Sequence, residues 1–151
     1  TILQQAAKTD PTNDRAKLEL ARLQTFLGHA NEAETTLASL SAETKASTEA
    51  VGLRAQLEFA RIVTSARPPE ALLPAIAANA RDSTARYELA AHLVLRQQYE
   101  AALDQLLEIV RTDRKFRDDA GRKAMVSVFN LLGGTGEIVN EYRRKLSLAL
   151  N

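Results

Sequence analysis

The chain of 151 residues has no cysteine, only six glycines and four prolines, and almost no net charge. Without cysteine it can carry no disulfide, no thiolate metal ligand and no cysteine nucleophile. No run of about 18 apolar residues occurs, so the sequence predicts no membrane-spanning helix. The 20 Lys and Arg residues nearly balance the 19 Asp and Glu residues. This balance argues against a nucleic-acid or anionic-membrane surface, which normally carries a large positive excess.

What remains is an ordinary soluble composition, with 45% hydrophobic and 26% charged residues. Alanine and leucine are abundant, and both favour helices, whereas glycine and proline are scarce. We therefore expect an all-α fold. The chain starts at Thr1 rather than at a methionine and shows no signal peptide. We expect it to be a segment of a longer protein.

An internal repeat appears when the chain is shifted by 69 residues. The matching pairs are Ala16 and Ala85, Glu19 and Glu88, Leu20 and Leu89, Ala21 and Ala90, Ala33 and Ala102, Leu37 and Leu106, and Leu40 and Ile109. This offset is twice 34 plus one, and about 34 residues is the tetratricopeptide period. Within each copy, small residues at the eighth and twentieth positions would let two helices approach closely. The pattern predicts a solenoid of tetratricopeptide helical hairpins.

The repeat divides the chain into a single domain of successive units. We expect the end of a truncated repeat at 1–13, a repeat at 14–47, a degenerate repeat at 48–82, a repeat at 83–117 and a pair of C-terminal capping helices at 118–151. In the degenerate unit, helices are predicted at about 51–63 and 70–80, separated by a break at Ser65-Ala66-Arg67-Pro68-Pro69. The capping helices are predicted at about 118–132, with Asp118 or Asp119 as the N-cap, and at 137–150.

The second half of the chain, about 69–150, resembles a known family. The segments that carry the resemblance, in order, are 86–111, Asp119-Ala120-Gly121-Arg122-Lys123, Leu131-Leu132-Gly133-Gly134-Thr135-Gly136 and 142–150. Together they resemble the C-terminal tetratricopeptide region of bacterial chaperedoxins. Chaperedoxins are fusions of an N-terminal thioredoxin-like domain to such a region, and the first half of this chain agrees with them only at the level of the repeat. The resemblance implies an upstream thioredoxin-like domain outside this sequence.

The resemblance also implies a function. Chaperedoxins are cytoplasmic co-chaperones that hold unfolded or oxidatively damaged clients and pass them to the chaperonin and the Hsp70 system. Their C-terminal helix is the implied docking element for the chaperonin. Carried over to this sequence, the docking residues are Tyr142, Arg143, Arg144, Leu146 and Leu150.

A concave groove is the usual binding surface of a tetratricopeptide hairpin, and the repeat positions that line it can be assigned. These are Arg15, Leu18, Arg22, Thr25 and Phe26 in the first copy, and Thr84, Tyr87, Ala91, Val94 and Leu95 in the later copy. The apolar members suit extended or unfolded protein segments. Alternatively, they pack against the chain's own cap or an upstream domain. Lys17 is the sole lysine on these helices, so we do not expect a Lys/Asn clamp for a C-terminal carboxylate.

Other readings of the sequence are weaker. A generic scaffold for an unrelated protein complex is the main alternative to the co-chaperone function. The cations at 111–123 are interleaved with aspartates, so a solvated face is favoured over a nucleic-acid surface. Gly133 to Gly136 lacks the strand and the Lys-Ser/Thr of a phosphate loop. His29 and His92 lie in no paired-ligand pattern, and no serine nucleophile motif occurs. We predict no enzymatic activity, cofactor or metal.

Overall fold

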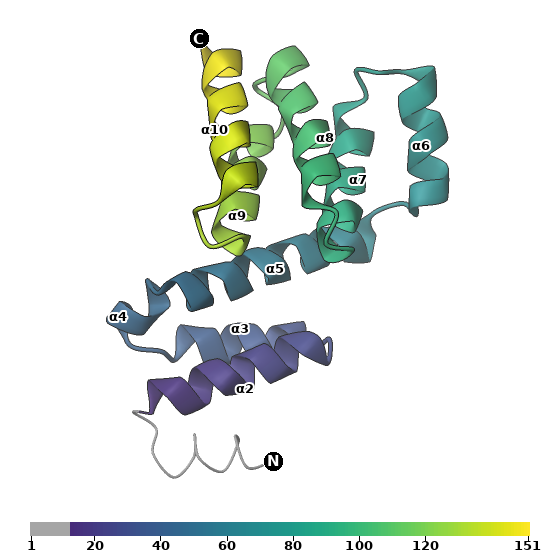
Figure 1. The fold of residues 1–151 in the computed structure, drawn as a ribbon. Coiled ribbons are helices and arrows are strands. Elements are labelled where there is room, and N and C mark those ends of the chain that lie inside the picture. The colour runs from purple at the N-terminus through teal and green to yellow at the C-terminus, as the bar shows by residue number, and fades with distance from the viewer. Residues whose placement is uncertain (1–12) are drawn as a thin grey trace.

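A computed structural model describes residues 13–151 of the chain. The expected end of a truncated repeat, 1–13, therefore falls almost entirely outside the described residues. Between residues 13 and 151 the chain forms nine α-helices and no strand, which confirms the all-α class. Figure 1 shows α2, α3 and α5 lying side by side. Helices α7, α8, α9 and α10 are steeply inclined to these three and lie on the other side of α5 from α2 and α3.

The first helical hairpin comprises α2 (Asp14–Phe26) and α3 (Ala30–Ala38), followed by the short α4 (Ala42–Lys45). The later copy comprises α7 (Ser83–Leu95) and α8 (Tyr99–Thr112). The two copies begin alike, because the Asn13 side chain accepts the Ala16 N–H at 3.1 Å and Asp82 accepts the Ala85 N–H at 3.0 Å. Such N-caps satisfy a free N–H of the first turn. The sequence did not predict α4.

The turns inside the two hairpins share one backbone geometry. Gly28 has a φ of +80°, and Gln97, its counterpart 69 residues later, has a φ of +61°. In the first turn His29 N–H donates to the Gln24 carbonyl at 2.8 Å, and in the second Gln98 N–H donates to the Leu93 carbonyl at 2.9 Å. These are Schellman bonds, which require a left-handed residue after the helix. Glycine adopts that conformation without steric cost, whereas glutamine does not.

We therefore expect Gln97→Gly to raise the free energy of unfolding by about 0.5–1 kcal/mol, since relief of the left-handed strain exceeds the added entropy of the unfolded chain. The reverse change, Gly28→Gln, should lower it by a similar amount. A Cβ at Gly28 would meet no atom within 4 Å, so its effect would come from the backbone alone. Urea denaturation followed by circular dichroism measures both. A destabilising Gln97→Gly would contradict this account.

A hydrogen bond ties the start of each hairpin to the segment after its second helix. Thr44 donates to the Asp14 carboxylate at 2.6 Å, and Ser83 donates to the Asp113 carboxylate at 2.8 Å. Asp14 is equivalent to Ser83 and Thr44 to Asp113, so the carboxylate and the hydroxyl have exchanged places while the bond is kept. Ser41 also donates to Asp14 at 2.5 Å. Bonds from Ser41 and Thr44 lower the pKa of the Asp14 carboxyl below its usual value.

Helix α5 (Thr48–Ser65) is long and belongs to two hydrophobic cores. Its first ten residues contribute Ala50, Leu53 and Leu57 to a core shared with α2 and α3. Phe59, two residues after Leu57, belongs instead to the larger core formed with α7, α8, α9 and α10. Helix α5 accordingly packs against α2 and α3 as well as α7 and α9. It is the element that joins the two halves of the solenoid.

Helix α6 (Pro69–Ala78) follows an extended break at Ala66 and Pro68, whose ψ angles are 151° and 155°. The predicted break is thus present, although it begins at Ala66 rather than at Ser65, and Pro69 occupies the first helical position, which suits proline. Pro74 is the sixth residue of α6, and its missing N–H leaves the Glu70 carbonyl without a helical donor. Helix α6 packs against α7.

The C-terminal pair comprises α9 (Ala120–Leu131) and α10 (Glu137–Leu150), and both pack against α8. When α10 is aligned with α8 at an offset of 36 residues, Arg143 and Lys145 of α10 fall at the positions of Leu107 and Ile109, which are buried in α8. In α10, charged residues thus replace the apolar residues against which a further repeat would pack. A polar outer face is typical of a capping unit.

The start of α9 corrects one expectation. The helix begins at Ala120 rather than at 118, because Arg117, Asp118 and Asp119 all have left-handed backbones, with φ of 42°, 58° and 67°. Asp119 occupies the N-cap position, but its side chain caps no N–H. It accepts instead from the Arg122 guanidinium at 2.5 Å. Neither aspartate therefore serves as the predicted cap.

Candidate protein-binding site

The expected concave groove is only partly open. Leu18, Ala91 and Val94 are buried, which corrects their assignment as groove residues. Leu18 packs into the core of α2, α3 and α5, whereas Ala91 and Val94 lie in the same core as Phe59 of α5. The physical reason is the position of α5, which lies across α7 and α9 and covers the face that regular stacking would leave exposed (Figure 1).

The remaining groove residues do not form one continuous surface. At one end of the fold, Arg22 of α2 bridges Glu19 at 2.8 Å and Glu49 at 3.0 Å. Arg15 lines a separate cleft beside the start of α5. On α7, Tyr87 packs edge-on against Phe116, with ring centroids 5.8 Å apart, and lies under Arg117. Burial raises the pKa of the Tyr87 hydroxyl. Of the ten positions, Phe26 and Leu95 remain as exposed large apolar side chains.

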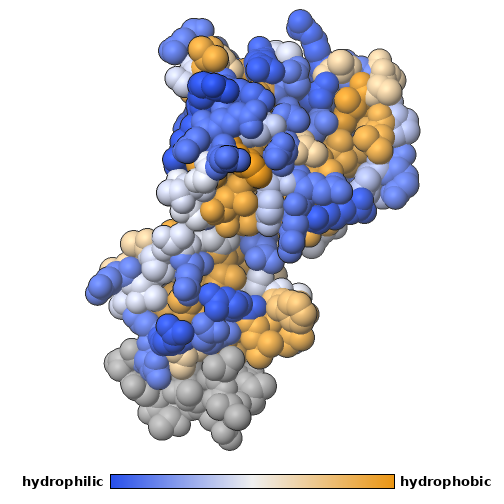
Figure 2. Space-filling model, in the orientation of Figure 1, coloured by the Kyte–Doolittle hydropathy of each residue, from blue (hydrophilic) through white to orange (hydrophobic). Residues whose placement is uncertain are grey.

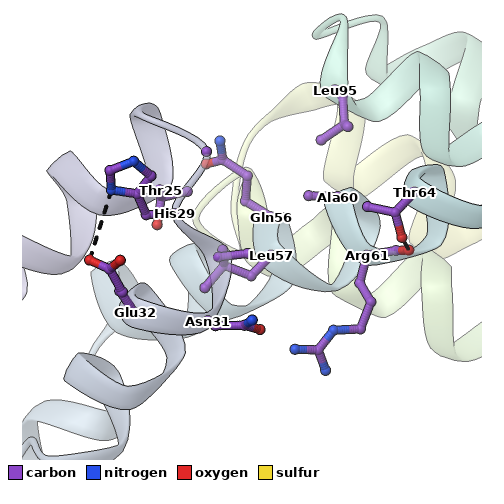
Figure 3. Close-up of a pocket in the computed structure, with 12 residues that line it drawn as sticks. Thr25, His29, Asn31, Glu32, Gln56, Leu57, Ala60, Arg61, Thr64 and Leu95 are labelled. Atoms are coloured by element: carbon purple, nitrogen blue, oxygen red, sulfur yellow. Dashed lines mark hydrogen bonds and ion pairs between the residues drawn. The ribbon is translucent and has the colours of Figure 1, made fainter.

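Leu95 lines a cleft of about 590 Å³ between the α2–α3 turn, α5 and the end of α7. Figure 3 shows Leu95 reaching from α7 toward Ala60 of α5, opposite the side chains of the turn. The lining residues are Thr25, Gly28, His29, Ala30, Asn31, Glu32, Gln56, Leu57, Ala60, Arg61, Thr64 and Leu95. The cleft therefore combines apolar side chains with amides, hydroxyls and charges, and pockets that bind ligands likewise combine apolar and polar groups.

Two large apolar residues stand beside this cleft where α2 ends. The Phe26 side chain is 84% exposed, and its neighbour Leu27 is more than half exposed. Figure 2 shows an apolar patch at this end of α2. The Schellman turn at Gly28 fixes the backbone here, and Phe26 and Leu27 lie in the chain between Thr25 and Gly28, which both line the cleft. A large exposed aromatic beside a cleft commonly marks a protein interface.

The predicted docking helix, α10, has only part of its expected residues available. Tyr142 and Leu146 are buried in the core with α8 and α9, so they offer a partner very little surface while α10 stays packed. The Tyr142 hydroxyl donates to Asp104 at 2.6 Å. Burial, together with this carboxylate, raises the pKa of Tyr142.

Of the predicted docking residues on α10, Arg143 and Arg144 are exposed, and Leu150 at the end of the helix is half-buried. The Arg143 guanidinium lies 5.6 Å from the Phe129 ring centre of α9. A second cleft, of about 420 Å³, runs between α9 and α10 beside these residues. It is lined by Val126, Phe129, Asn130, Arg143, Leu146, Ser147, Leu150 and Asn151.

Comparison with protein families decides what kind of chain this is. Two family models, both described as tetratricopeptide repeat, match it, one over residues 1–57 and the other over residues 62–151. The second match alone covers more than half of the chain. The chain belongs to the tetratricopeptide repeat family. Its fold is accordingly an all-α tetratricopeptide solenoid. The boundary between the two matches falls within α5, between Leu57 of the first core and Ile62, which packs against the second.

Tetratricopeptide repeats are generally non-catalytic scaffolds, and they serve as modules for protein–protein interaction. A comparison with curated proteins gave no match to this tetratricopeptide domain. Both histidines contact neighbouring groups of the same chain. His29 lies 3.8 Å from the Glu32 carboxylate, and the His92 ring contacts the Arg67 carbonyl at 2.8 Å. Over the described part of the chain, no cluster of three or more metal-ligating residues occurs. No helix among residues 13–151 is long and apolar enough to cross a bilayer.

The cations around the α8–α9 loop of the tetratricopeptide domain are mostly engaged with neighbours. Arg111 pairs with Glu108 at 3.2 Å, and Lys123 pairs with Asp118 at 3.1 Å. Arg117 lies over the rings of Tyr87 and Phe116. This is the solvated, internally compensated arrangement that the interleaved aspartates suggested, rather than a continuous positive track for phosphates.

Proposed function

We propose that this tetratricopeptide domain holds exposed apolar segments of unfolded or oxidatively damaged clients for the chaperonin and Hsp70 systems of the bacterial cytoplasm. The observation that carries the proposal is the cleft beside α5, which Leu95 lines, together with the exposed Phe26, which follows the lining residue Thr25 in the chain. The resemblance to chaperedoxins over the second half of the chain supports the same assignment, which includes an upstream thioredoxin-like domain.

The chemistry of the cleft suits an extended segment. An unfolded chain offers both apolar side chains and unpaired peptide groups. Ala60 and Leu95 can take the apolar side chains, while the amides of Asn31 and Gln56 can bond with the backbone. Arg61 is held by an ion pair to Glu34, so it does not place an isolated charge in the cleft.

The client site is tested by suppression of aggregation of a chemically denatured client. The variant Phe26→Ser/Leu95→Ser removes two exposed apolar side chains, and we expect it to need several-fold more protein for the same suppression. Leu148→Ser is the matched control, because Leu148 is also exposed but lies on α10, away from the cleft. Equal suppression by the wild type and the double variant would refute the client site.

Docking on a chaperonin is proposed to use the outer face of α10 through Arg143 and Arg144, because Tyr142 and Leu146 face the core. Deleting α10 is a poor test, since it would open the main hydrophobic core. The double charge reversal Arg143→Glu/Arg144→Glu leaves the core intact. We expect it to abolish binding of the chain to purified chaperonin in interferometry, with Arg96→Glu, at the exposed end of α7, as a control. Unchanged binding would reject this face.

A scaffold for an unrelated complex is the second candidate. The mixed polar lining of the cleft favours it, because fixed amides and hydroxyls suit one defined peptide better than many clients. A single stoichiometric partner, together with no suppression of client aggregation and no chaperonin binding, would support the scaffold over the co-chaperone.

A further inference from the structure

Helix α6 differs from the other surface helices of the domain in having almost no charge. Of its ten residues, from Pro69 to Ala78, Glu70 alone is charged. The chain as a whole is 26% charged, so two or three charges would be expected in a helix of this length. Helix α6 lies at the edge of the fold and packs against α7 (Figure 1).

One side of α6 is satisfied by the fold. Leu72 is fully buried in a small core with Ala85 and Leu89 of α7. Ala75 and Ile76 pack against that core and are half-buried. The sequence of α6 therefore places its buried residues on a single stripe, as expected for a helix that covers one neighbour.

The opposite side of α6 is apolar and exposed. Leu73 is 59% exposed, and the surrounding exposed residues of the helix are Ala71, Pro74, Ala77 and Ala78. We call this surface, Leu73 with those four residues, the α6 face. Figure 2 shows hydrophobic atoms over the region that α6 occupies. A leucine surrounded by alanines has the shape of a projection beside shallow depressions, which a matching helix could fill.

The charges at the two ends of α6 show which helix would match. Glu70 lies at its first turn, and Arg81 lies shortly after its end at Ala78. Among the ion pairs formed within residues 13–151, none involves either residue. An antiparallel copy of α6 would place each Glu70 near the partner's Arg81 and would oppose the two helix dipoles favourably.

We propose that the α6 face binds a second copy of the chain, with the two α6 helices antiparallel around a two-fold axis that passes between Pro74 and Ala77, midway between Glu70 and Arg81. The contact is isologous, so each Leu73 packs among the alanines of the other copy and two Glu70–Arg81 ion pairs close the ends. A helix of ten residues is only about 15 Å long, so the interface is small. The dimer is therefore weak and forms in a concentration-dependent manner.

The first test is the mass of the chain in solution, measured by sedimentation equilibrium from about 5 µM to about 500 µM. We expect the wild type to shift from monomer to dimer over this range. Leu73→Glu removes an apolar contact twice in the dimer and should raise the Kd about 100-fold. Leu148→Glu alters a leucine that is 70% exposed on α10 and should leave the Kd unchanged. A wild type that stays monomeric throughout, or a Leu73→Glu dimer of unchanged Kd, overturns the proposal.

Charge reversal tests the antiparallel register. Glu70→Arg and Arg81→Glu should each raise the Kd several-fold at low salt, because each places like charges together twice. The double variant Glu70→Arg/Arg81→Glu restores opposite charges at both ends and should recover the wild-type Kd. Both positions are exposed, and melting curves verify that the variants fold. A double variant as weak as either single one overturns the antiparallel arrangement.

Discussion

Replacing Phe59 by alanine is expected to lower the free energy of unfolding by about 3–5 kcal/mol. Phe59 is 1% exposed and is among the largest fully buried side chains of the described residues. It reaches from α5 into the core formed by α7, α8, α9 and α10. Alanine would lose the buried ring area and leave a cavity, because neighbouring helices relax only in part. Urea denaturation followed by circular dichroism measures the loss.

Phe26→Ala is the matched control, since it removes the same side chain from an exposed site. We expect less than about 0.5 kcal/mol of change in the free energy of unfolding, as is usual for surface positions. If Phe59→Ala were as mild as Phe26→Ala, α5 would not be the element that anchors the second half of the fold.

The same substitution also tests the division of α5 between two cores. Hydrogen exchange after Phe59→Ala should accelerate first in α7 to α10, whereas Leu57→Ala should accelerate it first in α2 and α3. Two residues apart on one helix, Leu57 and Phe59 thus report on different halves of the solenoid. Uniform acceleration by both variants would show a single cooperative core instead.

The fold could largely be predicted from the sequence, because its determinants are local. Helix α10 has the predicted bounds of 137–150, and the 69-residue offset matches equivalent caps, turns and hairpins in the two copies. Prolines 68 and 69 mark the break before α6 through a backbone restriction that needs no tertiary context. The predicted repeat boundaries remain predictions, and residues 1–12 fall outside the described part of the chain.

The binding surface was harder to predict, because exposure depends on how helices far apart in the sequence pack. Ala91 and Val94 occupy groove positions of a regular repeat, yet α5 covers them here. Tyr142 shows the same problem: an apolar stripe on α10 indicates a buried face but does not say whether the chain itself or a partner buries it. The cleft at Leu95 depends on the same arrangement of α5, and no local pattern marks it.

One close contact between two helices was not predicted, although a glycine in the sequence indicates it. Gly121, in the first turn of α9, lies against α8, and a Cβ there would stand 3.0 Å from Ile109 Cγ2 and 3.3 Å from the Leu106 carbonyl oxygen. The glycine lets α8 and α9 approach closely. A helical glycine next to a repeat boundary is a signal for such a contact, because glycine is otherwise unfavourable in a helix.

Gly121→Ala is therefore expected to lower the free energy of unfolding by about 1–3 kcal/mol, since overpacking against Ile109 and the α8 backbone outweighs the better helix propensity of alanine. The added methyl group cannot be accommodated by rotating a side-chain tip, because one of its neighbours is the Leu106 carbonyl. The shift in the urea midpoint measures the effect, and a stabilised variant would show that α8 and α9 do not approach so closely.

The same substitution at Gly52 of α5 should have the opposite sign. A Cβ there would meet the Asn130 carbonyl oxygen at 3.6 Å, an ordinary contact, so helix propensity decides and Gly52→Ala should add about 0.5–1 kcal/mol. Both variants add one methyl group to a helical glycine, and they differ only in the space around it. Opposite shifts would therefore isolate packing between α8 and α9 as the reason for Gly121, whereas shifts of the same sign would trace both glycines to backbone propensity alone.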